Sequence, residues 1–370
     1  MFPMTPRVIA EIHLTHLYAN LLALSRHAAS SHVLLPVKAN AYGHSAALVV
    51  QHTSDWKLIW GYAVASPEEA LEIMPLTRKP VLLLTPPAWE EAAQLARQGV
   101  RLTLSSLEEL LYLPAGSRIH LKVNTGMNRL GMRPEDVVRV AQTAQHRGVI
   151  VEGIFSHFAS ADAQDNQSAR RQLELFKEVK SSLEHAGMNG LIYHMSNSAG
   201  IEAFGHEAAF NLIRPGIAAY GFTTRPETGL PLKPVMRLMA RIGYLHTMQA
   251  GEKVSYGELW TAERDTLVAT LQIGYADGYP RSATGHALAR HGSEWREIIG
   301  RICMDQCMME VTGLQVQVGD YVEVMGFDAV TATQLAPHAN TIEYEVLTGI
   351  NARRVHHQAI SATEQVQVSP

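Results

Sequence analysis

The sequence predicts a parallel (β/α)8 barrel followed by a mainly β domain. Short β-branched and apolar runs alternate with helical patterns over the first 230 residues, about the length that such a barrel needs. Beyond residue 231 the helical patterns nearly vanish, and short strands separated by glycine-containing turns follow. Hydrophobic residues make up 46% of the 370 residues and charged residues 18%, which excludes a disordered or fibrous chain.

The barrel elements follow from the spacing of apolar residues. From Leu14, spacings of three and four predict an amphipathic helix. Eight strands are expected after it, at Val33–Lys38, Ile59–Val64, Val81–Thr85, Arg101–Ser105, Ile119–Asn124, Val151–Phe158, Ile192–Ser198 and Phe210–Gly216. Helices are expected between them, at Ser66–Met74, Trp89–Gln98, Pro134–Arg147 and Ser168–His185. A doubly wound open sheet is the alternative, but no G-x-G-x-x-G run follows the first strand.

A domain boundary is predicted at residues 224–234, because Pro226, Pro231 and Pro234 make this segment typical of a linker. We therefore expect a barrel domain over residues 1–230 and a mainly β domain over residues 231–370. Strands in the second domain are expected at Arg237–Met248, Thr266–Ile273, Glu297–Met304, Met308–Val311 and Tyr321–Met325.

Charge and composition narrow the function classes. The formal net charge of −4 offers no basic excess to hold a phosphate backbone, so nucleic-acid binding is not expected. Neither a secretory leader nor an apolar stretch of ~18 residues is visible, so we expect a cytoplasmic protein without a membrane partner. Cys303 and Cys307 lie four residues apart and lack zinc-site spacing, so no metal is expected.

Polar residues follow several of the predicted barrel strands. They are Lys38, Asn124 with nearby Arg129, His157, Asn197 with Ser198, and Arg214. Reacting groups of such barrels lie at the carboxyl ends of the strands. A lysine enclosed by apolar walls and cationic neighbours loses its proton more easily and becomes a nucleophile for carbonyl groups. The alternative is a lysine whose stem packs and whose ammonium reaches water.

Nine motifs are spread along the chain: Pro36-Val-Lys-Ala-Asn-Ala-Tyr-Gly-His44, Lys122-Val-Asn-Thr-Gly-Met-Asn-Arg129, Phe155-Ser-His157-Phe, Asn197-Ser198-Ala199, Arg214-Pro-Gly-Ile217, Val254-Ser-Tyr256-Gly, Ile273-Gly-Tyr-Ala-Asp-Gly-Tyr-Pro-Arg281, Gly300-Arg-Ile-Cys-Met304-Asp305 and Ile342-Glu-Tyr344-Glu. In this order, they resemble the motifs of the alanine racemase family. The resemblance covers essentially the whole chain. It departs at Ser45, where the family more usually has a glycine.

The resemblance implies a pyridoxal 5'-phosphate (PLP)-dependent isomerase that interconverts L- and D-alanine. Lys38 is expected to bind the cofactor aldehyde and to act as the base or acid on one face of the substrate Cα, with Tyr256 on the other. Racemisation removes a proton from one side and delivers one to the opposite side, so two opposed groups are the minimum. The product would supply D-alanine for peptidoglycan, or the enzyme would serve alanine catabolism.

The resemblance also assigns the remaining site residues. The expected cofactor-binding set is Lys38, Tyr42, His157, Ser198 (with Ser196 as an alternative), Arg214, Gly216, Ile217 and Tyr344. Arg129 and Met304 are expected to bind substrate, and Lys122, Asp305 and Tyr275 to support them. Lys122 stands at a position where the family often has a carbamylated lysine, and an unmodified lysine remains the alternative. Arg214 would face the pyridine nitrogen, where a guanidinium can donate a hydrogen bond but supplies no proton.

The family resemblance further implies a homodimer with shared active sites. The second subunit would contribute Tyr256, Tyr275, Arg281, Arg301 and Met304. Three alternatives remain open. The first is a racemase of another small amino acid such as serine, and the second is a non-catalytic PLP-binding protein. The third is a metal-dependent barrel hydrolase using His157, Asp162 and His194, which leaves Lys38 and Arg214 without a role.

Overall fold

A computed structural model describes residues 5–328 and 330–361 of the chain. Within them the chain separates into two compact units. Residues 18–41 and 49–232 form the first, here called the barrel unit. Residues 5–17, 42–48, 233–328 and 330–361 form the second, the β unit.

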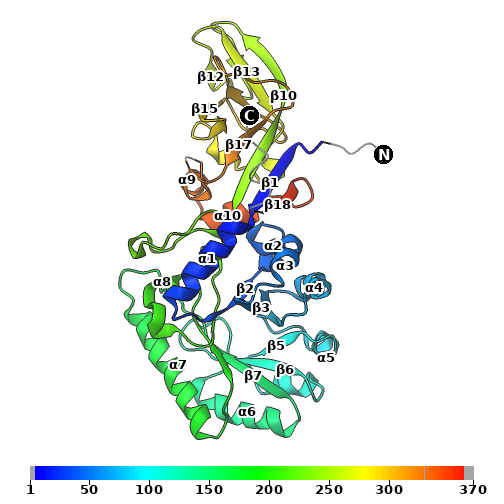
Figure 1. Ribbon diagram of the computed structural model, residues 1–370, viewed down its shortest axis with the longest axis vertical. Helices are drawn as coiled ribbons and strands as arrows, with labels where there is room; N and C mark the ends of the chain where they lie inside the picture. Colours follow the sequence, from blue (N-terminus) through cyan, green and yellow to red (C-terminus); the bar gives the residue numbers. More distant parts are fainter. Residues whose placement is uncertain (1–4, 329, 362–370) are drawn as a thin grey trace. The chain divides into compact units, whose positions relative to one another are not determined.

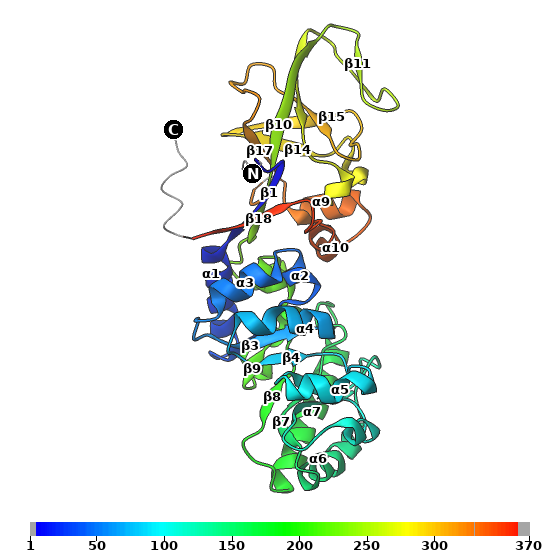
Figure 2. The ribbon, with the colours of Figure 1, turned by 90° about the vertical axis from the view of Figure 1, so that its right-hand side faces the viewer.

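The barrel unit is a closed parallel barrel, in which each strand pairs with the next and β9 returns to β2. Figures 1 and 2 together label its strands. Its strands among the described residues are β2 (His32–Pro36), β3 (Ile59–Val64), β4 (Val81–Leu83), β5 (Arg101–Leu104), β6 (Arg118–Lys122), β7 (Ile150–Phe155), β8 (Ile192–His194) and β9 (Leu212–Ile213). All eight fall on predicted strands, which confirms the fold class. Strands that are buried on both faces explain the near-continuous apolar runs.

Helices cover the outside of these strands, as Figures 1 and 2 show for α4, α5, α6 and α7. The helices of this part of the chain are α1 (Leu14–His27), α3 (Ala46–Thr53), α4 (Pro67–Ile73), α5 (Trp89–Arg97), α6 (Val137–His146), α7 (Gln167–His185) and α8 (Ser198–Phe204). Helix α4 begins with a capping box between Ser66 and Glu69 and with Pro67 in its first turn. Proline is favoured in the first turn, because a backbone N–H at that position would have no acceptor within the helix. The lack of an N–H in proline therefore costs no hydrogen bond there.

The first barrel strand was expected at Val33–Lys38, but β2 ends two residues earlier, at Pro36. The next segment, α2 (Lys38–Tyr42), is a left-handed turn with φ between 50° and 55° at Ala39, Asn40, Ala41 and Tyr42. Left-handed geometry costs roughly 1–2 kcal/mol for each residue with a Cβ. Glu69 offsets part of this cost, because its Oε1 accepts the Ala39 N–H at 2.6 Å and its Oε2 accepts the Ala65 N–H at 2.7 Å.

The β unit is built on a sheet with the strand order β13-β16-β15-β14-β17-β10-β1-β18, in which β13 also pairs with β10. Figure 1 labels β1, β10, β13, β15, β17 and β18 of this sheet. The strands are β1 (Val8–His13), β10 (Met236–Met248), β13 (Thr266–Leu271), β14 (Leu288–His291), β15 (Glu294–Ile299), β16 (Cys307–Glu310), β17 (Tyr321–Met325) and β18 (His356–Ile360), with β11 (Lys253–Val254) and β12 (Trp260–Thr261) as a separate ribbon. Strand β1 comes from the first residues of the chain, yet it pairs antiparallel with β10 and parallel with β18.

Two expectations for the second half of the chain were wrong. Of the strand predicted at Glu297–Met304, only the first three residues lie in β15, and residues 300–304 form a loop that begins at Gly300 with φ +66°. Helices do not nearly vanish, because α9 (Ala332–His338) and α10 (Glu343–Thr348) follow β17. Both are shorter than eight residues, so their apolar periodicity is hard to distinguish from that of a loop.

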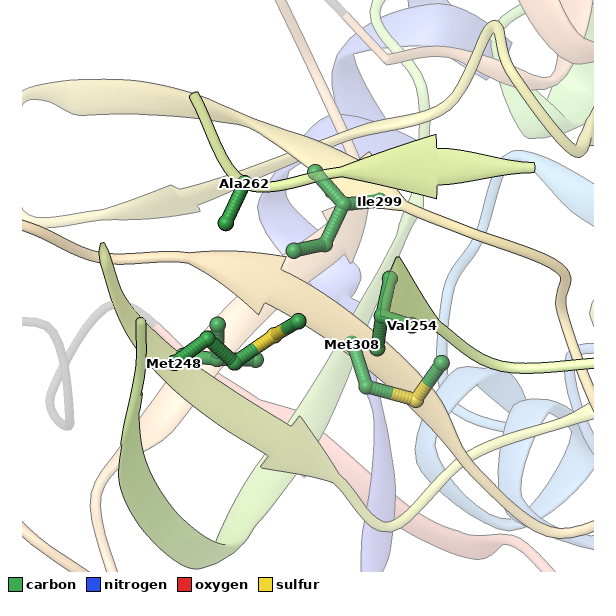
Figure 3. Packing of buried hydrophobic residues seen from close by; sticks show 6 residues of the cluster. Met248, Val254, Ala262, Ile299 and Met308 are labelled. Atoms are coloured by element: carbon green, nitrogen blue, oxygen red, sulfur yellow. The ribbon is translucent and has the colours of Figure 1, made fainter. Parts of the chain in front are cut away.

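A hydrophobic cluster supports the β11–β12 ribbon, as Figure 3 shows. Buried side chains from the ribbon and from the sheet pack together there: Met248, Val254, Ala262, Val268, Ile299 and Met308. Trp260 packs against the same cluster. Val254 is two residues from Tyr256, so the packing fixes the ribbon that carries this tyrosine.

Among the described residues, no helix combines the length and the apolar character that crossing a bilayer requires.

Candidate active site

Arg214 is the centre of a polar cluster in the barrel unit. It follows β9 and is 3% exposed. Its Nη1 lies 2.7 Å from His194 Nδ1, and its Nη2 donates to the carbonyl oxygens of Ser156 (2.7 Å) and Met195 (2.9 Å) and lies 3.1 Å from His157 Nδ1. These acceptors are all neutral. Burial lowers the pKa of the guanidinium to about 9, so it remains charged at neutral pH.

A guanidinium carries five N–H groups, and the contacts of Arg214 leave some of them available. Nη2 has three acceptors for its two hydrogens, and Nη1 has one acceptor. In the described part of the chain, no residue accepts from Nε or from the second hydrogen of Nη1. The side chain is therefore held firmly and still has donors for a ligand.

Two lysines lie in the field of this cation. Lys38 follows β2 and is half-buried. Burial, followed by the charges of Arg129 and Arg214, lowers the pKa of its ammonium. Lys122, the last residue of β6, is 6% exposed, with Nζ 4.7 Å from the ring centroid of Phe155. Burial and the same two arginines lower the pKa of Lys122 well below its usual range. Both ammonium groups therefore lose a proton more readily than that of an exposed lysine.

His157 is held neutral between two polar neighbours. Its Nδ1 faces Arg214, and its Nε2 lies 3.2 Å from Nδ2 of Asn197. Asn197 is itself fixed, because its Oδ1 caps α8 by accepting the Gly200 N–H at 2.9 Å. Burial and the charge of Arg214 lower the pKa of the imidazole well below its usual range. Because Arg214 only donates, the neutral ring accepts its N–H at Nδ1 and carries its own hydrogen on Nε2.

Ser198 lies against the turn that follows Arg214. Its Oγ accepts the Ala218 N–H at 3.1 Å, which leaves the hydroxyl hydrogen available. Ile217 begins a short 3-10 helix (Ile217–Tyr220), where the first N–H has no intrahelical acceptor. The hydroxyl of Ser196 instead donates to the carbonyl oxygen of Ala208 at 3.1 Å. Ser198 therefore contacts the backbone of the short helix that begins at Ile217, whereas Ser196 bonds elsewhere.

Arg129 is exposed on the loop after β6. The loop is shaped by Asn124, whose Oδ1 accepts the N–H groups of Gly126 (3.1 Å) and Asn128 (3.0 Å). Asn128 has a positive φ of 57°, a conformation that asparagine tolerates better than most residues.

The β unit holds a second group of candidate residues around a hollow of about 460 Å³. Its lining includes Tyr256, Tyr275, Arg281, Arg301, Met304 and Asp305. Tyr256 is 73% exposed and Met304 53%. The loop of Tyr275 is fixed to the loop of Met304, because Tyr275 N–H donates to the Cys303 carbonyl (3.1 Å) and Ala276 N–H to the Met304 carbonyl (2.9 Å).

Arg354 binds Asp305, one of the residues that line this hollow. Its guanidinium binds Asp277 at 2.8 Å and Asp305 at 2.5 Å. Asp277 is fully buried, and its Oδ2 accepts the Gly274 N–H at 3.0 Å.

Tyr42 and Tyr344 also belong to the β unit, with ring centroids 6.0 Å apart. Each unit thus brings together its own share of the predicted residues. The barrel unit holds Lys38, Lys122, Arg129, His157, Ser198, Arg214, Gly216 and Ile217, and the β unit holds the tyrosines, Met304 and Asp305.

The metal-site alternative fits the barrel unit poorly. His157 and His194 each place a ring nitrogen on the Arg214 guanidinium, a cation that would repel a second cation. Over residues 5–328 and 330–361 there is no group of three His, Cys, Asp or Glu side chains that could hold a metal ion.

The sequence interpretation did not find the polar residues beneath Arg214. His194 was considered only as a metal ligand, and His120 and Glu152 were not considered. The available indication was a histidine between the apolar residues Ile119 and Leu121 of β6, and another at the end of β8.

A closed (β/α)8 barrel with two amines beside a buried guanidinium, followed in the chain by a mainly β domain, defines a two-domain barrel enzyme. The alanine racemase N-terminal domain model matches residues 12–224, and the C-terminal domain model matches residues 235–358. The chain belongs to the alanine racemase family.

Individual relatives agree over nearly the full length of the chain. An alanine racemase of Deinococcus deserti is 47% identical over 354 residues, covering 95% of this chain and 98% of the relative. The structure of an alanine racemase from Clostridium difficile 630 superimposes with a TM-score of 0.87 at 30% identity, covering 96% of this chain and 97% of that one. An alanine racemase structure from Bartonella henselae with covalently bound pyridoxal phosphate has a TM-score of 0.80 at 28% identity, covering 97% and 100% of the two chains.

Proposed function

We propose that this protein is a PLP-dependent enzyme that interconverts L- and D-alanine with Lys38 and Tyr256 as the two bases. The observation that carries the proposal is the placement of Lys38. It lies at the carboxyl end of a barrel strand, with its pKa lowered by burial and by Arg129 and Arg214. Membership of the alanine racemase family supports the reaction and the substrate.

The residues of the barrel unit fit the cofactor. Lys38 offers an amine for its aldehyde, and the unused N–H groups of Arg214 suit a ring nitrogen that only accepts a hydrogen bond. Ser198 Oγ and the N–H groups of Gly216 and Ile217 suit the phosphate, to which we also assign Tyr42 and Tyr344. When bound, PLP delocalises the negative charge that is left at Cα after a proton is removed.

Each base handles one face of Cα. The Nζ of Lys38 takes or delivers the proton on one side, and the phenol oxygen of Tyr256 does so on the other. His157 lies on Arg214 and is held neutral, so it can fix the phenol by a hydrogen bond without competing as an acid. Because Arg214 does not donate a proton to the ring, the charge at Cα is delocalised less, which limits side reactions.

Arg129 is assigned to the substrate carboxylate, which its planar fork matches. The lowered pKa of Lys122 suits addition of CO₂ to its free amine, which releases one proton and gives a carbamate anion that would orient Arg129. The backbone N–H of Met304 is assigned as a further donor to the substrate. Asp305 and Tyr275 support Met304 through the loop contacts described above.

We further propose a homodimer in which one subunit's barrel is completed by the partner's Tyr256. The exposed side chains around the hollow of the β unit support this, because large exposed apolar groups mark interaction surfaces. The domain over residues 1–230 would then bind the cofactor, and the domain over 231–370 would supply the catalytic tyrosine. The cytoplasm is the expected site of action, with D-alanine used for peptidoglycan or alanine degraded.

The test measures cofactor and substrate in one purified sample. We expect a yellow protein from which borohydride fixes PLP to Lys38, and loss of optical activity from L-alanine much faster than from L-serine or L-lysine. A protein that stays colourless with added PLP would contradict the cofactor assignment. Racemisation of L-serine or L-lysine that is faster than that of L-alanine would overturn the substrate assignment.

A further inference from the structure

A chain of hydrogen-bonded side chains leads away from Arg214 through the buried part of the barrel unit. Arg214 Nη1 lies 2.7 Å from His194 Nδ1, and His194 Nε2 lies 2.8 Å from His120 Nδ1. His120 Nε2 then lies 3.3 Å from Oε2 of Glu152. Both histidines are fully buried. The chain ends at a carboxylate that also binds Arg101 (3.2 Å) and Arg118 (3.1 Å).

The donors and acceptors of this chain allow one arrangement of protons. A guanidinium only donates, so His194 Nδ1 accepts and its Nε2 carries the hydrogen. That hydrogen points at His120 Nδ1, which must therefore accept, and His120 Nε2 carries a hydrogen that it donates to Glu152. Burial lowers the pKa of both imidazoles, well below the usual range for His194, so both rings are neutral. The proposed tautomer of each ring follows from its neighbours.

Two backbone features make room for the chain. Strand β7 lies between β6, which carries His120, and β8, which carries His194. Gly153 of β7 pairs with His120, and a Cβ on this glycine would lie 2.5 Å from His120 Nδ1. The register of β6 and β7 shifts at the same point, so Glu152 is an extra residue in β7. A bulge of this kind redirects a side chain, here the carboxylate of Glu152 to His120.

Resting on the function proposed above, we propose that Glu152, His120 and His194 position Arg214 toward the cofactor ring. None of the acceptors that contact Arg214 is charged. The carboxylate of Glu152 is therefore the anion to which the hydrogen-bonded histidines connect the guanidinium. With both tautomers fixed, His194 Nδ1 accepts only from Nη1 and holds the guanidinium in one plane. Nε and the second hydrogen of Nη1 then remain directed to the ligand.

The carboxylate end of the chain is itself firmly ionised. Burial raises the pKa of Glu152, but the hydrogen bond from His120 and the charge of Arg101 outweigh this effect and bring the pKa to about 2. The negative charge at the end of the chain is therefore constant across the working range of the enzyme.

The decisive comparison uses two substitutions of His120 in the full-length protein loaded with PLP. In His120→Gln, the amide can accept from His194 and donate to Glu152, so the chain is preserved. In His120→Leu, an apolar side chain that suits a buried site replaces the imidazole and breaks the hydrogen-bonded chain. We expect the Leu variant to raise the dissociation constant of PLP at least about tenfold and the Gln variant less than about threefold. A packing role alone would give the reverse order, because an apolar residue suits a buried site best.

A second readout is independent of the cofactor. With ¹⁵N-histidine labelling, the cofactor-free protein should show protonated Nε2 and unprotonated Nδ1 for His120 and His194 between about pH 6 and 9. Glu152→Gln should shift the ring N–H signal of His120, whereas Glu202→Gln should not. Glu202 is a matched control, since it is a buried carboxylate that binds Thr223 and the N–H groups of Thr224 and Arg225.

The outcomes separate this inference from the proposed function. If the wild-type protein fails to bind PLP or racemise alanine, the proposed function fails while the tautomer measurement still decides the chain. If it does both, and the two His120 variants behave alike or either ring has its hydrogen on Nδ1, the positioning role is overturned.

Discussion

The two units present their polar residues in opposite ways. In the barrel unit the central group, Arg214, is almost fully buried and has four protein acceptors, and the pKa values of its neighbours are displaced. In the β unit Tyr256 is 73% exposed on a short ribbon, and the hollow beside it is open. The barrel groups are preorganised by the fold of one chain. The side chain of Tyr256 is exposed, so it can act as a base on a bound substrate only if another surface covers it.

The largest expected effect comes from removing the proposed base of each unit, which tests whether the two units have different roles. Lys38→Ala and Tyr256→Phe should each lower kcat for alanine racemisation about 10³-fold, since a positioned base contributes 10²–10⁴-fold. They should differ in the cofactor: Tyr256→Phe keeps PLP that borohydride can fix, and Lys38→Ala does not. Stopped-assay polarimetry and the absorbance of the fixed cofactor provide the measurements. Equal cofactor retention in both variants would contradict the division of roles.

The second prediction concerns the contribution of the Glu152 charge to the stability of the barrel unit. Glu152 has a pKa of about 2 against the ordinary 4.5, so its stabilising contribution is complete above about pH 4.5 and is lost as the pH falls through about 2. Glu152→Gln should therefore lower the free energy of unfolding of the cofactor-free protein by about 2–3 kcal/mol near pH 7, and by about 1 kcal/mol less near pH 3.5. Denaturant titrations at the two pH values measure this.

Glu258→Gln is the control for the β unit. Glu258 forms an exposed ion pair with Lys253, so the change should be within about 0.5 kcal/mol at either pH. A loss as large as that of Glu152→Gln would show that burial does not distinguish the two units.

The smallest expected effect sharpens the role of the cluster in Figure 3. Val254→Ala removes buried methyl groups beneath the ribbon of Tyr256 and should cost about 1–2 kcal/mol of stability. Because the ribbon carries Tyr256, kcat should fall severalfold while PLP affinity is unchanged. A fall in PLP affinity instead, measured by equilibrium titration, would argue that the cluster supports the cofactor site.

Much of the fold could be predicted from the sequence, because buried parallel strands are nearly continuous apolar runs. The eight barrel strands and the helix starting at Leu14 are examples, and the fold class that they define is confirmed. Strand β1 was not predicted, since its partners β10 and β18 lie more than 200 residues away in the sequence. Local patterns do not encode such pairing.

The motifs predicted which residues form the candidate site. The backbone geometry and the contacts around these residues could not be predicted from the sequence. The left-handed turn at Ala39–Tyr42 contradicts local propensity, because alanine favours the right-handed helix. Ser45 shows the same limit: it stands where the family more usually has a glycine, and its φ is 68°. The contact of His120 with His194 depends on Gly153 and on the bulge at Glu152, which no residue spacing reveals.

Subunit mixing tests the central claim most directly, namely that the barrel of one chain and the tyrosine of another make one site. Lys38→Ala and Tyr256→Phe proteins, each nearly inactive, are mixed in equal amounts, dissociated and reassociated. Random pairing should restore about a quarter of the wild-type sites, because half of the dimers are mixed and each has one intact site. Mixed dimers that are demonstrably present but regain no activity would place both bases in one chain and contradict the account.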